Sequence, residues 1–307
     1  MSLKERITEA FPEKEFTLKE AYEVINDKPA TTIRGRIYDN LGITFERVGE
    51  GIYKTIRDDQ QCILIEGNGR DLSFLEDKSI DCIITDHPWK EEKSNKGGNR
   101  NFANYDCFKY EQSDFDEKAR VLKDGHFLVE MLPAENENNF EYLYNIKKMA
   151  QKAGFQYYAK VPWIKGKFVS NTGRKSKNSE DMMIFSKGKA RAMRPNVKKN
   201  LAEPGVDHFM SGTAKMLPTD FNVQAVNKKE TVNQSEKPVG LIEEILEYLT
   251  FDKELVLDQF AGSGVVGEAC LNKKRNCILI EKSHKSVKNI QKRLSMIPEY
   301  EEKEIAK

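Results

Sequence analysis

The clearest chemical signal in the sequence is a glycine-rich turn that follows a short apolar segment. The stretch Leu255-Val-Leu-Asp-Gln-Phe-Ala-Gly-Ser-Gly-Val-Val-Gly-Glu-Ala269 predicts a buried strand that ends at Asp258 and a tight turn built on Gly262 and Gly264. A helix is expected to begin directly after this turn. Glycines are needed where a ligand must approach the backbone at the carboxyl end of a strand. The segment therefore predicts a binding site at the edge of a sheet.

An acidic residue at a matching distance makes this prediction more specific. Nineteen residues after Gly262, a second apolar segment ends in Glu281. A carboxylate at that distance can accept hydrogen bonds from both hydroxyls of a ribose. A glycine turn alone is weak evidence, but the turn together with this Glu is much stronger. The two features predict a site for an adenosine-containing cofactor.

A second set of polar groups follows another apolar strand, in Ile83-Ile-Thr-Asp-His-Pro-Trp89. Asp86 offers a hydrogen-bond acceptor, the backbone around Pro88 offers carbonyl groups, and Trp89 offers a stacking face. Such a set can hold a planar ring and accept hydrogen bonds from an exocyclic amine. Without that context, Asp-x-Pro-Trp has the composition of an ordinary turn.

The two motifs together resemble those of the amino-methyltransferases that use S-adenosylmethionine, in the beta-type order of DNA N6-adenine and N4-cytosine methyltransferases. That family has an Asp/Ser/Asn-Pro-Pro-Tyr/Phe/Trp catalytic motif, then a target-recognition segment, then Asp-Pro-Phe-x-Gly-Ser-Gly. Here Asp86-His-Pro-Trp89 precedes Asp258-Gln-Phe-Ala-Gly-Ser-Gly264. Three further segments match in order: Arg120-Val-Leu-Lys-Asp-Gly125, Glu180-Asp-Met-Met-Ile-Phe-Ser-Lys-Gly188 and Glu236-Lys-Pro-Val-Gly-Leu241.

The resemblance implies a role for each matched residue. In the catalytic motif Asp86-His87-Pro88-Trp89, the Asp86 carboxylate and the His87 carbonyl would accept the hydrogens of the target amine, and Trp89 would stack on a flipped base. The implied cofactor is S-adenosylmethionine, and no metal is required. The residues expected to line it are Asp258, Phe260, Gly262 and Gly264, with Glu281 at the ribose, Lys237, Pro238 and Leu241 at the methionine end and, more loosely, Asp71 at the adenine amine.

Two positions depart from the family pattern. His87 replaces the first proline of the catalytic motif, and Gln259 replaces the proline after Asp258. Proline restricts φ, so we expect a more mobile catalytic loop around His87. The departures also leave open a DNA-binding regulator whose methyltransferase core is inactive.

The first residue of the catalytic motif favours one target base. In the family, Asp at this position is typical of adenine enzymes and Ser of cytosine enzymes, so Asp86 predicts methylation of adenine N6 in double-stranded DNA. The alternatives are an N4-cytosine methyltransferase and an RNA methyltransferase, while a small-molecule enzyme would need no basic surface. The resemblance also makes a homodimer and a cognate restriction nuclease candidate partners.

Alternating apolar segments and helical patterns predict an α/β fold, with a seven-stranded Rossmann-like sheet of parallel strands covered on both faces. The expected strands are Cys62–Glu66, Asp81–Thr85, His126–Glu130, Tyr157–Trp163, Met182–Phe185, Glu254–Leu257 and Asn276–Ile280. The expected helices are Phe115–Leu122, Asn139–Ala153, Pro238–Leu249, Val265–Leu271 and Ser286–Leu294. The methyltransferase domain would span residues 60–307, with a catalytic half over 60–189 and a cofactor half over 235–307.

Residues 1–58 predict a separate, smaller module. Helical patterns at Leu3–Phe11, Leu18–Ile25 and Pro29–Gly42 precede a hairpin whose turn is Gly49-Glu-Gly51. This order resembles a winged helix-turn-helix, whose third helix enters the major groove of DNA. Its candidate DNA-reading residues are Thr31, Thr32, Arg34 and Arg36. A helical docking or dimerisation module is the alternative.

Positive charge is concentrated in one part of the chain. Lys165 to Lys199 contains eight Lys and three Arg against two acids, a net charge of +9 in a protein whose overall net charge is +1. Such a run predicts a surface for a polyanion, although a solvated face is the simpler interpretation. The candidate DNA-binding residues are Lys165, Lys167, Arg174, Lys175, Lys177, Arg191 and Arg194. Residues 190–234 lack periodicity and match the family's target-recognition segment by position.

Composition excludes several other classes of protein. The sequence contains no apolar run near the roughly 20 residues that span a bilayer, and its charged N-terminus lacks a signal peptide, so we expect a cytoplasmic protein. The five cysteines are scattered and predict reduced, mostly buried thiols. None of the four histidines pairs with another at a ligand spacing, which argues against a zinc site.

Overall fold

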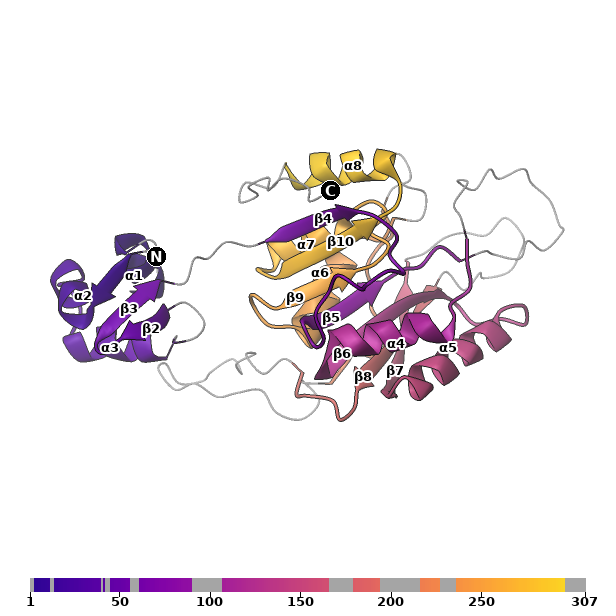
Figure 1. Ribbon diagram of the computed structural model, residues 1–307, viewed down its shortest axis with the longest axis horizontal. Helices are drawn as coiled ribbons and strands as arrows, with labels where there is room; N and C mark the ends of the chain where they lie inside the picture. The colour runs from indigo at the N-terminus through magenta and orange to yellow at the C-terminus, as the bar shows by residue number, and fades with distance from the viewer. Residues whose placement is uncertain are drawn as a thin grey trace. The chain divides into compact units, whose positions relative to one another are not determined.

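The computed structural model describes residues 3–11, 14–39, 41, 45–55, 61–89, 107–165, 179–193, 216–226 and 236–295. The chain divides into two compact units, Met1–Asp59 and Gln60–Lys307. Figure 1 labels most of the helices and strands of both units. Each unit has its own hydrophobic core.

The larger unit is built on a seven-stranded sheet in the order β4-β10-β9-β5-β6-β8-β7 (Figure 1). Its strands are β4 (Cys62–Glu66), β5 (Ile80–Thr85), β6 (Leu122–Pro133), β7 (Phe155–Ile164), β8 (Ser179–Lys187), β9 (Leu255–Asp258) and β10 (Asn276–Glu281). All seven predicted strands are present. The expectation of a wholly parallel sheet is wrong, because β8 runs antiparallel to both β6 and β7. Antiparallel neighbours need no crossover helix, and the sequence has no helical pattern between β7 and β8.

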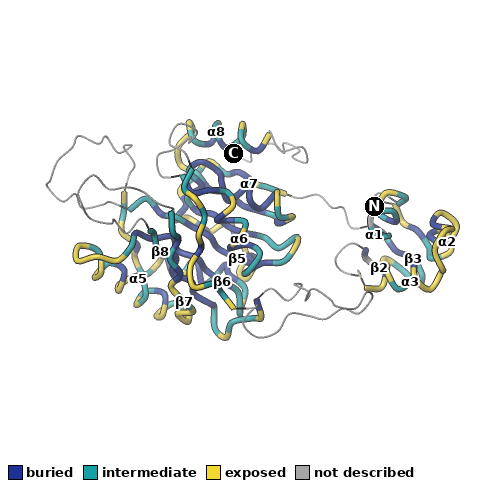
Figure 2. Tube along the Cα trace, turned by 180° about the vertical axis from the view of Figure 1, so that it is seen from behind, coloured by how far each residue is buried: buried dark blue, intermediate teal, exposed yellow. Residues whose placement is uncertain are grey.

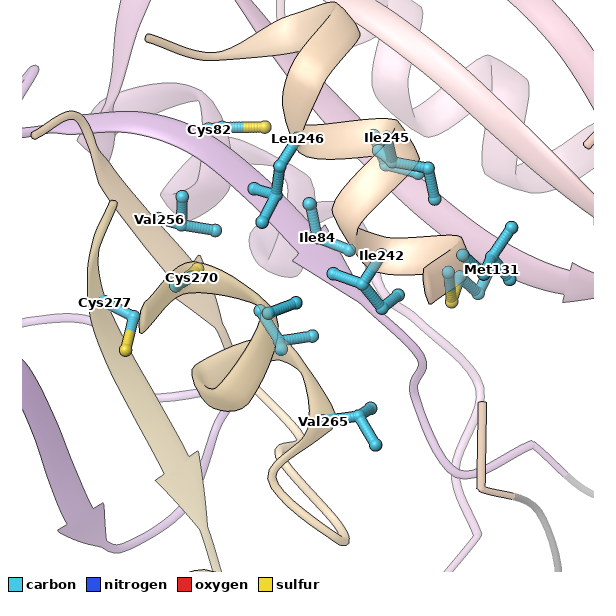
Figure 3. Packing of buried hydrophobic residues seen from close by; sticks show 14 of the residues in the cluster. Cys82, Ile84, Met131, Ile242, Ile245, Leu246, Val256, Val265, Cys270 and Cys277 are labelled. Carbon is cyan, nitrogen blue, oxygen red and sulfur yellow. The ribbon is translucent and has the colours of Figure 1, made fainter. Parts of the chain in front are cut away.

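Helices cover both faces of this sheet, so its central strands are apolar on both sides. They are α4 (Gln112–Val121), α5 (Phe140–Lys152), α6 (Val239–Leu249), α7 (Val265–Asn272) and α8 (His284–Leu294). One hydrophobic cluster joins the sheet to α6, α7 and α8, and a second joins it to α4 and α5. Figure 2 shows the buried trace running through the centre of the sheet. Figure 3 shows Ile242 and Leu246 of α6 pointing toward Ile84 of β5.

The order of the strands brings the two halves of the sequence together. Strand β9, from the cofactor half, lies beside β5, from the catalytic half, with Val256 opposite Cys82 and Leu257 opposite Ile83. Both strands run in the same direction, so the residues that follow them meet at one edge of the sheet. Ligands of open α/β sheets bind at such an edge, where strands from the two halves diverge.

The described residues of the smaller unit form three helices and a three-stranded sheet. Helices α1 (Leu3–Ala10), α2 (Leu18–Val24) and α3 (Ala30–Tyr38) enclose a core with β1 (Glu15–Thr17), β2 (Phe45–Gly49) and β3 (Ile52–Thr55). Strand β3 pairs antiparallel with both β1 and β2. Strand β1 was not predicted, because three residues are too few to show a period. A reciprocal cap between Thr17 and Glu20 starts α2, as expected of a capping box.

The cysteines differ from the expectation of reduced thiols. Cys62 and Cys277 lie opposite each other in adjacent strands, with their Cα atoms 4.6 Å apart, and form a disulfide. Their separation of 215 residues in the sequence hid this pairing, which depends on strand register alone. Cys82 and Cys270 are buried free thiols, and Cys107 is an exposed one.

Candidate active site

The glycine-rich turn after β9 has a backbone conformation that depends on its glycines. Gly262 and Gly264 have φ angles of 57° and 80°, a left-handed conformation that L side chains rarely adopt. Gly264 is the N-cap of α7. The Glu281 carboxylate accepts hydrogen bonds from the backbone N–H groups of Gly262 and Ser283, both at 2.8 Å. The acid at the end of β10 therefore holds the turn at the end of β9.

A second loop, after β4, is interlocked with this turn. The Gln259 side chain is buried, and its amide donates a hydrogen bond to the Gly69 carbonyl at 2.6 Å. A Cβ atom at position 69 would lie 1.8 Å from the Gln259 carbonyl oxygen. Gln259, which replaces the proline of the family motif, therefore joins the loop after β4 to the turn after β9. Asp71, two residues further on, is exposed and accepts hydrogen bonds from Ser73.

These residues fit an adenosine-containing cofactor. Each Glu281 oxygen accepts one backbone hydrogen bond and can accept a second, so ribose hydroxyls can be held there. Phe260 is partly exposed and offers an apolar surface beside the turn. Pro238 is the N-cap of α6. The Leu241 side chain is fully buried in the core beneath α6, and its contact with the methionine end of the cofactor stays a prediction.

The catalytic motif follows β5, and its acid is paired with a lysine from the cofactor half. Lys237 forms an ion pair with Asp86, 151 residues earlier in the chain, and its Nζ atom lies 3.2 Å from a Glu180 oxygen. Lys165 forms an ion pair with the same Glu180. Four alternating charges therefore run along the carboxyl edge of the sheet. Sequence reasoning placed Lys237 at the cofactor and did not select Glu180.

Burial and these charges set the protonation of the groups. Burial raises the pKa of Asp86, and the positive charge of Lys237 opposes that rise. Burial alone would raise the pKa of Glu180, but Lys237 and Lys165 hold it below its usual value. Burial alone would lower the pKa of Lys237, yet Asp86 and Glu180 raise it. Lys237 therefore remains charged, and it favours an ionised Asp86.

Asp258 behaves differently from Asp86. Burial, with weaker contributions from the charges of Asp86 and Glu281, raises the pKa of Asp258 to about 8. Its carboxyl group accepts one hydrogen bond, from the Phe260 backbone N–H at 3.1 Å. Without a bound cation, this acid is therefore largely protonated at neutral pH.

The side chain of His87 is buried, with 1% of its surface exposed. Its Nε2 atom lies 2.6 Å from the Tyr142 hydroxyl, and its ring packs against the Tyr110 ring at a centroid distance of 4.1 Å, with the two planes tilted by 36°. Burial and the nearby charge of Lys118 lower its pKa well below the ordinary value, so the imidazole is neutral. These contacts fix the position of the His87 side chain, while the expected mobility of the catalytic loop stays a prediction. Tyr110, Lys118 and Tyr142 belong to no recognised motif, so the sequence analysis did not select them.

Known proteins resemble this chain in both sequence and fold. Residues 80–292 match the family of N6 and N4 methyltransferases described as DNA methylase, which is more than half of the chain. The chain belongs to this family. S-adenosylmethionine is therefore supported as its cofactor. A curated relative is the type II methyltransferase M.HpaI of Haemophilus parainfluenzae, which is 25% identical over 230 residues, or 73% of this chain and 70% of the relative.

Solved structures share the fold of this methylase at lower identity. The M1.HpyAVI complex with SAM has a TM-score of 0.51 and 19% identity over 76% of this chain and 100% of the other. The PvuII cytosine-N4-specific DNA methyltransferase has a TM-score of 0.56 and 17% identity over 76% of this chain and 86% of the other. The putative DNA modification methylase TTHA0409 of Thermus thermophilus, complexed with S-adenosyl-L-methionine, has a TM-score of 0.51 and 15% identity over 78% of this chain and 97% of the other.

The predicted DNA-binding residues of the methylase occupy several different environments. Arg34 and Arg36 are exposed on α3, whereas Lys165 lies at the active-site edge and contacts Glu180. The Arg191 guanidinium is half-buried, pairs with Glu254 and donates a hydrogen bond to the Leu249 carbonyl at 2.7 Å, and its contact with DNA stays a prediction. Outside the described residues lie Lys167, Arg174, Lys175, Lys177, Arg194 and most of segment 190–234.

A cluster at the opposite edge of the sheet already has internal partners. Asp81, His126 and Glu254 have ligand atoms within 4.8 Å of one another. Lys123 pairs with Asp81 at 2.6 Å, and Arg191 pairs with Glu254. Both acids are therefore neutralised by protein cations. In the part of the chain that is described, no helix is long and apolar enough to cross a bilayer.

Proposed function

We propose that this methylase transfers a methyl group from S-adenosylmethionine to the N6 amine of an adenine in double-stranded DNA. The observation that carries the proposal is the contact between Asp86 and Lys237, in which the acid of the catalytic motif meets a residue of the cofactor half. The strands β5 and β9 that bring these halves together are hydrogen-bonded neighbours. The cofactor, when bound, supplies an electrophilic sulfonium methyl group.

The protein's task is to prepare the amine as a nucleophile. Its lone pair is delocalised into the purine ring, so it attacks poorly. Asp86 and the His87 carbonyl would accept its two hydrogens and favour a tetrahedral nitrogen, and positioning would supply most of the acceleration. An ionised carboxylate can accept about four hydrogen bonds, so Asp86 can contact Lys237 and the amine together. The proton released can pass to Asp86 or to water.

A base inside a duplex cannot reach this edge, so it would be flipped out at a cost of a few kcal/mol. Stacking on Trp89, which is partly exposed, would return about 1–3 kcal/mol. The smaller unit, with Arg34 exposed on α3, would contribute to DNA binding as a winged helix-turn-helix. The expected location remains the cytoplasm, and a homodimer and a cognate nuclease remain candidate partners.

Nucleoside mass spectrometry of DNA from cells that express the protein tests this proposal. N6-methyladenine should appear with the wild type and with Asp116→Asn, an exposed position on α4, but not with Asp86→Ala. N4-methylcytosine instead would establish the alternative base, and a methylated base in RNA alone would establish the alternative substrate. Bound S-adenosylmethionine without any methylated base would favour a DNA-binding regulator.

A further inference from the structure

The side chain of His87 lies in a pocket made of aromatic rings. The Tyr110 ring packs against it at 4.1 Å between ring centroids, and the rings of Phe108 and Tyr142 lie 5.7 Å and 5.9 Å away. The Phe108 backbone N–H donates to the Pro88 carbonyl at 3.2 Å. Phe108 therefore contacts the catalytic motif through both its ring and a backbone hydrogen bond.

Tyr142, on α5, links this segment to the histidine. Its hydroxyl accepts a hydrogen bond from the Tyr110 backbone N–H at 3.3 Å and lies 2.6 Å from Nε2 of His87. A hydroxyl can donate one hydrogen bond and accept two, so it can serve both contacts with either neutral tautomer of the imidazole. The Nδ1 atom of His87 has no partner among the described residues. The Tyr142 contact is therefore the hydrogen bond that orients the ring.

A buried ion pair supports the other side of the pocket. Lys118 of α4 contacts Glu130 of β6 at 2.5 Å, and both side chains are fully buried. The Tyr110 hydroxyl donates to the other Glu130 oxygen at 3.1 Å, and the Lys118 ammonium lies 3.7 Å from the centre of the Tyr110 ring. Tyr110 is thus held at its hydroxyl, at its ring and at its backbone. A ring fixed in this way is a rigid surface for His87.

We infer that Tyr142 is a positioning residue for methyl transfer, and that it acts by anchoring the side chain of His87 and so orienting the His87 carbonyl toward the target amine. The inference rests on the proposed function. A proline in this position would restrict the backbone through its own ring. Here the same restriction comes from tertiary contacts, because a side chain locked in a pocket limits the rotation of the peptide beside it.

The test is a double-mutant cycle on single-turnover methyl transfer, normalised to bound S-adenosylmethionine. Tyr142→Phe keeps the ring and removes the hydroxyl, and we expect the rate to fall by about tenfold. His87→Ala should lower it at least as much, and the double variant should be no slower than His87→Ala. The KM for the cofactor should change by less than about twofold in each variant. The matched control is Tyr144→Phe, which removes an exposed tyrosine hydroxyl from the same helix.

A second cycle, on unfolding by urea, measures the anchor without using activity. Coupling between positions 87 and 142 in both cycles supports the inference. If the two single variants lose rate independently, so that the losses multiply in the double variant, the inference is overturned. It is also overturned if the variants differ from the wild type only in the fraction of protein that binds S-adenosylmethionine. Coupling in unfolding with no methyl transfer by the wild type would reject the proposed function, and the positioning role with it, while leaving the anchor established.

Discussion

At the scale of single residues, the carboxyl edge of the sheet is organised by charge. Lys237 contacts both Asp86 and Glu180, and Lys165 contacts Glu180 again. Truncating one member of a buried charge set is costly, because its partner remains buried and uncompensated. The arrangement therefore links the ionisation of Asp86 to a residue that the motif does not contain.

We expect Lys237→Met to lower kcat at neutral pH by about tenfold or more. The lysine holds the pKa of Asp86 down against burial, so its removal raises that pKa and protonates more of the acid. Because an acid ionises as pH rises, the activity of the variant should recover toward high pH. The measurement is kcat between pH 6 and 9, with Lys288→Met, exposed on α8, as the control.

Adding Glu180→Gln to the variant should restore part of the lost rate, because it removes the negative charge that faces Asp86. A loss of kcat that does not depend on pH, with a higher KM for S-adenosylmethionine, would instead assign Lys237 to the cofactor, as the sequence motif implied.

Asp258 leads to a prediction about stability. Its pKa is raised to about 8 in the folded protein, so the folded state binds this proton more tightly than the unfolded state does. The contribution of Asp258 to stability is therefore greatest below its unfolded pKa of about 4, and it is lost as pH rises toward 8. Asp258→Asn should abolish that loss. We expect the cofactor-free variant to be more stable than the wild type by about 1 kcal/mol or more at pH 8, and similar to it near pH 4.

Urea unfolding at several pH values measures this difference. Asp116→Asn serves as the control, since that side chain is exposed on α4. Equal pH dependence of the wild type and Asp258→Asn would contradict the assignment of a protonated Asp258.

At the scale of elements, the cofactor edge depends on two loops that fit closely together. The loop after β4 passes so near the turn after β9 that Gly69 has no room for a side chain. Gln259 closes the contact with a buried hydrogen bond. The loops of β4 and β9 therefore form one structure, although the sequence separates them by 190 residues.

Gly69→Ala should force these loops apart. Its Cβ would lie 1.8 Å from the Gln259 carbonyl oxygen and 2.8 Å from the Phe260 ring. We expect a loss of stability of about 2 kcal/mol or more and weaker binding of S-adenosylmethionine, measured by calorimetry. The matched control is Gly67→Ala in the same loop, where the nearest atom is an ordinary 3.7 Å away. Equal cofactor affinity in the two variants would contradict the interlocked arrangement.

At the scale of the whole molecule, two units with separate cores share one chain. The methylase core accounts for the chemistry, and the smaller unit is the proposed contributor to DNA binding. Its third helix buries Ile33 and Ile37 and exposes Thr31 and Arg34. A helix with one buried and one polar face can present the polar face to a groove.

Arg34→Gln tests that contribution. Loss of one phosphate contact should weaken DNA binding several-fold and lower the slope of log K against log salt by about 1. The rate at saturating DNA should not change. The control is Lys19→Gln, also exposed, on α2. Unchanged affinity and an unchanged salt slope would favour the alternative of a docking or dimerisation module.

The sequence by itself determined the elements and the two motifs of this protein. Apolar runs that end in Asp258, Glu281 or Asp86 mark buried strands and the polar groups that follow them. These signals are local, since strand period, glycine turns and helix caps depend on residues only a few positions apart. The seven strands and five helices that the structure describes in the larger unit could therefore be predicted from the sequence alone.

Only the tertiary structure decided which of these residues meet. The disulfide of Cys62 and Cys277, the antiparallel course of β8 and the pairing of Lys237 with Asp86 all follow from strand order and register. The pocket around His87 likewise combines rings from segments that have no common pattern. Such contacts join positions far apart in the chain, and they are selected by the packing of the whole core. The residues next to each of these positions in the sequence do not show which distant residue it contacts.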